Sequence, residues 1–187
     1  MKAAGVILAI GLALALQTTL ARFVVRGTVP IDLGVVVVVY VALTSGPVAG
    51  LLSGTAAGLL QDALSVTGLL SGTASGFSQD VLSGGVIGIG GLAKSIVGFL
   101  AGVVGTQFIV ARPGPRFVVF LSATLLHAVV FIGLYALLDL RQFVAPYGAV
   151  ASQAVGNAVV GVVAFQLVEL WPGVIERRRA QKARIRR

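Results

Sequence analysis

Five polar side chains fall within stretches of sequence that are otherwise apolar, and their types are those that could do chemistry. They are Asp62, Asp80, Lys94, His127 and Asn157. Because an ionisable group at membrane depth is expensive to bury, Asp62 and Asp80 are the best functional candidates. We expect the two aspartates to lie at the ends of their helices, in contact with headgroup water. The alternative is that they lie deep and serve a functional site.

The basic and amide side chains also have two interpretations. Lys94 lies one to two turns into its apolar stretch, so we expect its ammonium to extend to the membrane surface. An ion pair with Asp62 or Asp80 is the alternative. For His127, the only histidine, we expect an interhelical hydrogen bond rather than a proton relay. Asn157 lies four residues after a glutamine, on one helical face, and we expect this pair to form interhelical hydrogen bonds.

The sequence offers little for catalysis. It has no cysteine and a single histidine, so thiolate chemistry and disulfides are excluded. No Ser-His-Asp arrangement and no closely spaced pair of carboxylates is present. The stretch GVIGIGG from Gly85 resembles a dinucleotide-binding loop, but no βαβ unit surrounds it. We therefore expect a protein that is not an enzyme and that has no cofactor or metal.

The composition is that of an all-α integral membrane protein. Of the 187 residues, 57% are hydrophobic and 11% are charged, whereas soluble domains have about 25% charged residues. Even the valine run 35–39 is expected to be helical, because an open strand would leave its backbone unpaired in lipid. Trp171-Pro172 is expected to end the last span. Apolar stretches predict spans at residues 3–21, 31–44, 86–110, 117–138 and 146–170.

The chain divides into a polytopic membrane domain, residues 1–172, and a basic tail, residues 173–187. Residues 3–21 also resemble a signal peptide, but we expect an uncleaved helix because further spans follow. Basic residues beside a span favour the cytoplasmic side. We expect the tail to bind anionic headgroups and not nucleic acid. Half of the fourteen basic residues lie in this tail: Arg177, Arg178, Arg179, Lys182, Arg184, Arg186 and Arg187.

An internal repeat occupies the remaining stretch. Residues 51–68 and 69–86 share eleven of eighteen positions, and both copies contain a Gln-Asp pair. As one straight helix, residues 46–85 would be about 60 Å long, twice the thickness of the hydrocarbon core. The stretch must therefore break or fold back. One net crossing gives six spans, which we expect, with the repeat as a broken or re-entrant segment; two crossings give seven.

Glycines spaced by four residues predict close helix packing. In lipid this spacing lets two helix backbones approach each other. We expect these glycines to face neighbouring helices; the alternative is a broken helix that lines a substrate path. The packing candidates are Gly46, Gly50, Gly54, Gly58, Gly72, Gly76, Gly98 and Gly102.

Part of this pattern resembles a known family. The stretch GFSQDVLSGGVIGIGGLAKSIVGFLAG, residues 76–102, resembles the central signature of the rod-shape-determining MreD family, and residues 32–50 resemble its second span and turn. This chain departs from the family in carrying the glycine-and-aspartate unit twice. The positions that match the signature are Gly76, Asp80, Ser83, Gly84, Gly88, Leu92, Gly98 and Phe99.

The resemblance implies a fold and a function. The family is similar to the six-helix substrate-binding subunits of vitamin-uptake transporters. Its members are non-enzymatic subunits of the cell-elongation machinery in the bacterial inner membrane. They bind MreC, and through it the MreB filaments and the peptidoglycan synthases. The alternative function is a small-molecule uptake subunit, which needs a pocket with convergent polar groups. A proton or ion pathway through Asp80, Lys94 and His127 is a third interpretation.

Overall fold

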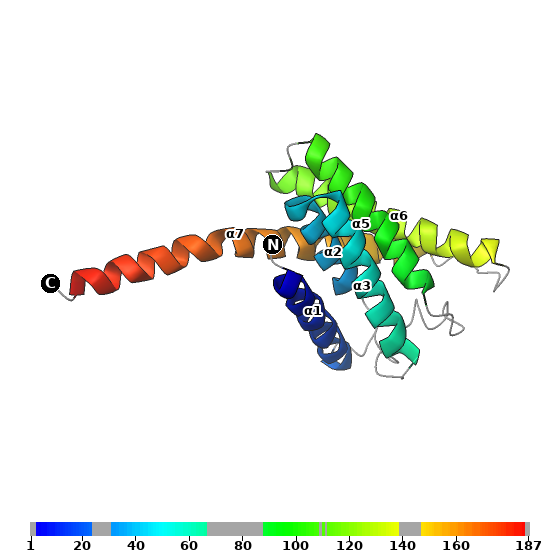
Figure 1. Cartoon of the computed structure of the whole chain (residues 1–187), viewed down its shortest axis with the longest axis horizontal. Helices are drawn as coiled ribbons and strands as arrows, with labels where there is room; N and C mark the ends of the chain where they lie inside the picture. The colour runs from blue at the N-terminus through cyan, green and yellow to red at the C-terminus, as the bar shows by residue number, and fades with distance from the viewer. Residues whose placement is uncertain are drawn as a thin grey trace.

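The computed structural model describes residues 3–23, 31–66, 88–108, 110, 112–138 and 147–185. In this part of the chain every regular element is an α-helix, as the composition predicts (Figure 1). The helices are α1 (Ala3–Phe23), α2 (Leu33–Ser45), α3 (Pro47–Val66), α5 (Ile89–Gln107), α6 (Pro113–Leu137) and α7 (Tyr147–Ile185).

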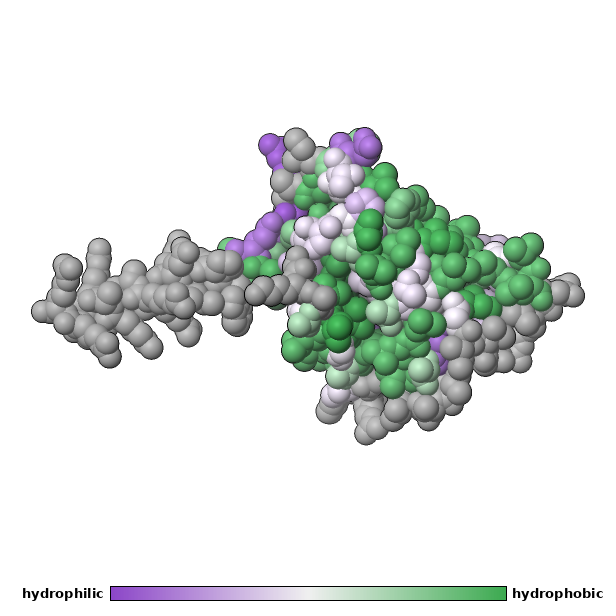
Figure 2. Space-filling model, in the orientation of Figure 1, coloured by the Kyte–Doolittle hydropathy of each residue, from purple (hydrophilic) through white to green (hydrophobic). Residues whose placement is uncertain are grey.

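The helices have the length and composition of a membrane protein. Among the described residues, Ile89–Gln107, Pro113–Leu137 and Tyr147–Leu170 are long and apolar enough to cross a membrane, and Ala4–Gln17 and Leu33–Ser45 are shorter apolar helices. The outer surface is apolar over most of the face seen in Figure 2. A soluble monomer rarely exposes such an extensive apolar surface, so we treat the chain as a helical membrane protein.

A single glycine forms the turn between α2 and α3. Gly46 has φ 90° and ψ −178°, and its N–H donates to the carbonyl of Ala42 at 2.9 Å. Residues with a side chain rarely adopt a positive φ of this kind. Pro47 then begins α3, because the φ of proline is already close to the helical value. The space beside the missing side chain of Gly46 is open. Gly46 is thus required by the backbone turn, and its backbone also lies close to α5, because a Cβ on Gly102 would overlap Pro47 and the carbonyl carbon of Gly46.

The other glycines of the first ladder bring α3 and α5 together. A Cβ on Gly50 would overlap the backbone of Gly98, and one on Gly58 would overlap that of Gly91. A Cβ on Gly54 would overlap the backbone of α5 at Lys94. These two helices make the most extensive contact in the described structure, and α2 packs against both. We call α2, α3 and α5 the trio.

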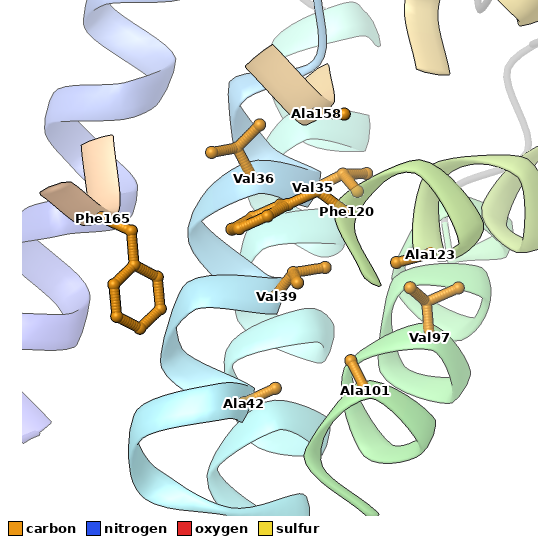
Figure 3. Close-up of a cluster of buried hydrophobic side chains, with 10 residues drawn as sticks. All are labelled: Val35, Val36, Val39, Ala42, Val97, Ala101, Phe120, Ala123, Ala158 and Phe165. Atoms are coloured by element: carbon orange, nitrogen blue, oxygen red, sulfur yellow. The ribbon is translucent and has the colours of Figure 1, made fainter. Parts of the chain in front are cut away.

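Two further helices, α6 and α7, pack on each other and lie obliquely across the trio (Figure 1). We call them the pair. An apolar cluster fills the space between the pair and the trio (Figure 3), and α1 packs along α2 and α3 through Ile10 and Leu14. The cluster contains Val35, Val36, Val39, Ala42, Val97, Ala101, Phe120, Ala123, Ala158 and Phe165.

The last candidate span ends where the sequence predicts, because Tyr147–Leu170 stops directly before Trp171-Pro172. The helix α7 itself continues to Ile185 and extends beyond the bundle (Figure 1). An internal proline costs about 3 kcal/mol. Here it is followed by residues 176–184, most of which are strong helix formers, including Arg177, Arg178 and Arg179.

Several predictions lie outside the described residues. The second copy of the repeat does so entirely, and with it Gly72, Gly76 and Asp80. In the tail the structure describes the helical backbone to Ile185, but not the side chains of Arg177–179 and Lys182. The headgroup contacts of the tail therefore stay a prediction.

Candidate functional site

An ion pair lies buried at the centre of the described structure. Lys94 Nζ is 3.0 Å from Asp32 Oδ2, and both side chains are at most 1% exposed. The expectation that Lys94 extends to the surface is therefore wrong, and its partner is Asp32 rather than Asp62; Asp80 lies outside the described residues. Gly34 makes this possible, because a Cβ there would lie 3.4 Å from Lys94 Cε and 3.0 Å from Asp32 Oδ1.

Asp32 is also the N-cap of α2. Its Oδ1 accepts a hydrogen bond from the N–H of Val35 at 3.1 Å, and its carbonyl accepts one from Val36 at 3.2 Å. A carboxylate at this position satisfies backbone donors and interacts favourably with the helix dipole. Since α2 has only thirteen residues, it is about 20 Å long and cannot span the whole hydrocarbon core. The carboxylate is thus held in the protein interior by the start of a short helix.

His127 approaches the same ammonium from α6. Its Nε2 lies 3.5 Å from Lys94 Nζ, and its ring stacks on Phe131 with centroids 5.9 Å apart. An ammonium has only donors, so Nε2 must accept and the proton of a neutral imidazole must sit on Nδ1. The expected interhelical hydrogen bond of His127 is present, as a long contact to Lys94.

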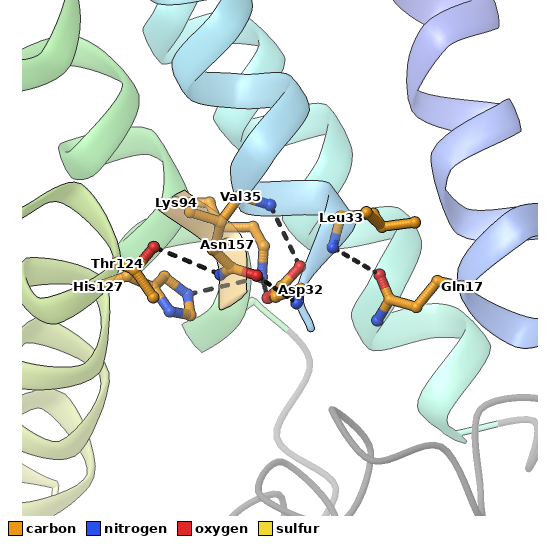
Figure 4. A network of polar contacts seen from close by, with 8 residues as sticks. All are labelled: Gln17, Asp32, Leu33, Val35, Lys94, Thr124, His127 and Asn157. Atoms are coloured by element: carbon orange, nitrogen blue, oxygen red, sulfur yellow. Dashed lines mark hydrogen bonds and ion pairs between the residues drawn. The ribbon is translucent and has the colours of Figure 1, made fainter. Parts of the chain in front are cut away.

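Asn157 joins α7 to this centre (Figure 4). Its Oδ1 accepts a hydrogen bond from the backbone N–H of Asp32 at 2.9 Å. Its Nδ2 donates to Thr124 Oγ1 at 3.3 Å, and Thr124 in turn donates to the carbonyl of Phe120 at 2.9 Å. One buried amide therefore connects α2, α6 and α7, as expected of an interhelical hydrogen-bonding group.

Sequence reasoning missed three members of the centre: Gln17, Asp32 and Thr124. Gln17 Oε1, on α1, accepts a hydrogen bond from the N–H of Leu33 at 3.1 Å. Asp32 itself was not among the candidates, although it is the first acidic residue of the chain and directly precedes a long apolar run. That position is a typical N-cap signal. No comparable signal marks Gln17, because its partner is a backbone group sixteen residues away.

Asp62 lies apart from this centre, at the end of α3. Its Oδ2 accepts a hydrogen bond from the N–H of Gly88 at 2.8 Å, directly before α5. Its Oδ1 faces Gly90, where a side chain would collide with it. The half-buried carboxylate therefore caps the start of a neighbouring helix, which agrees with a structural role at a helix end.

A second ion pair connects α6 and α7. Arg116 donates to Glu169 through both terminal nitrogens, with Nη1 2.8 Å from Oε2, and its Nε donates to the carbonyl of Val110 at 3.1 Å. Its guanidinium lies 3.9 Å from the ring centre of Phe165, which makes an edge contact with Tyr40. Arg116 lies in the first turn of α6.

A groove on the outer side of α3 and α5 is apolar. It has a volume of about 570 Å³, and its walls include Leu51, Leu59, Leu92 and Phe99. Among the described residues no group of three or more histidine, aspartate or glutamate side chains could hold a metal ion. The groove therefore offers apolar contact, whereas Asp32 and Lys94 lie in the closed centre.

The chemistry of the centre is that of mutual neutralisation. The carboxylate, the ammonium, the imidazole and the amide bind one another and the starts of helices. Such an arrangement holds helices in fixed positions. Comparison of the chain with protein-family models, with curated proteins and with solved structures gives no match in any of the three. Function is therefore inferred from this site and from the sequence resemblance.

Proposed function

We propose that the chain is a non-enzymatic membrane scaffold subunit of the bacterial cell-elongation machinery, similar to MreD. It would lie in the inner membrane and bind MreC, and through it act with MreB and the peptidoglycan synthases. The observation that carries the proposal is the closed polar centre: its charged groups are engaged with residues of the same chain. A subunit of this kind presents surfaces to partners and needs no open site.

The same observation speaks against the alternative, a substrate-binding subunit of an uptake transporter. In broken-helix transporters the start of a half-helix inside the membrane binds the anionic group of the substrate. Here the corresponding position, the start of α2, is occupied by the carboxylate of Asp32, with the ammonium of Lys94 as its counter-ion. A small anionic substrate would have to displace a buried, paired carboxylate.

We also propose six spans with a cytoplasmic C-terminus. The hydrogen bond from Gly88 to Asp62 supports this number, because it holds the start of α5 beside the end of α3. The end of α3 and the start of α5 therefore lie on the same side, which agrees with a single net crossing by residues 46–85. The basic residues of the tail then lie in the cytoplasm and bind anionic headgroups.

Depletion of the protein in its host tests the function. If the proposal holds, rod-shaped cells become round and lose incorporation of labelled cell-wall precursor along their sides. Supplied vitamins should not restore their shape. A growth defect that an external vitamin or other small nutrient corrects, with cell shape preserved, would overturn the scaffold and support the uptake subunit.

A further inference from the structure

The helix α3 fills a slot that is formed by α2 and α5. A Cβ on Gly50 would overlap both the backbone of Gly98 on α5 and the side chain of Ala42 on α2. Further along α3, Thr55 Oγ1 lies 2.7 Å from Ser95 Oγ of α5. We call this surface of α2 and α5 the α3 slot. The buried residues of α3 are Gly50, Ser53, Gly54, Ala57, Gly58 and Gln61.

The second copy of the repeat has almost the same set of residues at these positions. The copies are eighteen residues apart, which is about five helical turns, so equivalent positions would share one side of a helix. Thr55 and Asp62, which contact α5, recur as Thr73 and Asp80. Among the buried positions only Ala57 differs, and its counterpart Ser75 is also small. The identical counterparts of the others are Gly68, Ser71, Gly72, Gly76 and Gln79.

The remaining differences lie on the outer side of α3. Within residues 51–64 the copies differ at four positions, and three of these are exposed: Leu59, Leu60 and Ala63. The second copy has Phe77, Ser78 and Val81 there. A substitution on the exposed side leaves the contacts with α2 and α5 unchanged. The second copy therefore retains the residues that fit the α3 slot.

The position of the second copy in the chain also suits the slot. The helices α3 and α5 are antiparallel, because Gly50 lies beside Gly98 and Gly58 beside Gly91. With Asp80 in the place of Asp62, residues 81–87 would form the connection to α5. Connections between neighbouring helices in bundles usually have about two to eight residues, so this short connection permits the same antiparallel packing.

We propose that the second copy can fill the α3 slot in place of α3, so that the repeat supplies two alternative occupants for one position. The slot accommodates one helix at a time. In the arrangement described here α3 fills it, and Ala57 favours this choice because it packs on Ile10, Leu14 and Val38 without burying a hydroxyl. This inference goes beyond the scaffold function and does not depend on it.

Two deletions, each of one repeat unit from the otherwise intact chain, test the proposal. Removing residues 51–68 joins Gly50 to Leu69, and removing residues 69–86 joins Gly68 to Ile87. The two variants have equal length and differ only at the seven positions that distinguish the copies. Each retains one occupant in the register of α3. We expect both variants to purify as folded, monodisperse proteins.

A disulfide reports which segment lies in the slot. The oxygens of Thr55 and Ser95 are 2.7 Å apart, so cysteines at both positions can form a disulfide in this cysteine-free chain. Thr55→Cys with Ser95→Cys in the full chain is the reference. In the variant without residues 51–68, Thr73→Cys with Ser95→Cys should form a disulfide within one chain as completely as the reference does.

A matched control excludes random collisions. Ala74 is the counterpart of Ala56, which is exposed on α3, so Ala74→Cys with Ser95→Cys should form no disulfide in the same deletion variant. The proposal is overturned if the variant without residues 51–68 does not fold, or if position 73 forms no disulfide with position 95. A disulfide that links two chains would also overturn it. So would failure of both deletion variants to fold, since one occupant would then not suffice.

Discussion

Lys94 shows how one side chain can be placed by its neighbours. Sequence reasoning treated it as a long basic residue near a helix end, for which the membrane surface is the usual destination. The structure instead gives it a glycine beside its stem, a carboxylate at 3.0 Å and an imidazole at 3.5 Å. These groups come from different parts of the chain, so no local sequence pattern predicts that they meet.

Removing one charge of this pair should cost much more than removing both. Lys94→Met leaves Asp32 buried without its counter-ion, and we expect a loss of about 3–5 kcal/mol of stability. Adding Asp32→Asn should recover most of that loss. Thermal unfolding in detergent measures both variants. A double variant that is less stable than Lys94→Met would contradict the assignment of the pair.

Asp62 allows a second prediction at this scale. Because its carboxylate accepts a hydrogen bond from Gly88, Asp62→Asn keeps an acceptor and should be nearly neutral, whereas Asp62→Leu should lose about 1 kcal/mol or more. Comparing the thermal unfolding of the two variants shows whether Asp62 acts as a hydrogen-bond acceptor or through its negative charge. Equal losses from Asn and Leu would show that the negative charge is what matters.

At the scale of helices, the glycine ladder was the most informative feature of the sequence. Spacing by four residues is a local property, and it correctly indicated that Gly50, Gly54 and Gly58 approach another helix. It could not name α5 as that helix, nor show that Gly46 is also required for its φ of 90°. Trp171-Pro172 correctly marked the end of the last candidate span, but not the continuation of α7 to Ile185, because helix-forming residues follow the proline.

Two glycines form a matched pair for testing this packing. Gly58 lies against the backbone of Gly91, whereas Gly133 on α6 faces open space. Gly58→Leu should destabilise the protein by about 1–3 kcal/mol or prevent folding, and Gly133→Leu should leave it unchanged. Melting temperature and elution profile in detergent report the difference. If both variants behave alike, the ladder does not hold α3 and α5 together.

For the whole molecule, composition was sufficient to predict a helical membrane protein, but the arrangement of its helices depends on contacts that are distant in sequence. The link from Asp32 to Asn157 spans 125 positions. Topology can be tested with a cysteine at position 3. The six-span arrangement places it in the cytoplasm, so an impermeant thiol reagent added from the periplasmic side should not label it. Labelling from that side would support seven spans.

The most direct test of the proposed function is native mass spectrometry of the tagged protein, gently extracted from its own membranes. If the protein is a scaffold subunit, we expect a complex of this protein with MreC. No small molecule should be released when the complex is dissociated. Arg116→Met with Glu169→Gln, which leaves the central ion pair in place, serves as a folded control and should retain the partner. A complex that instead contains an ATPase-bearing transporter module, or a stoichiometric small ligand, would contradict the scaffold and establish an uptake subunit.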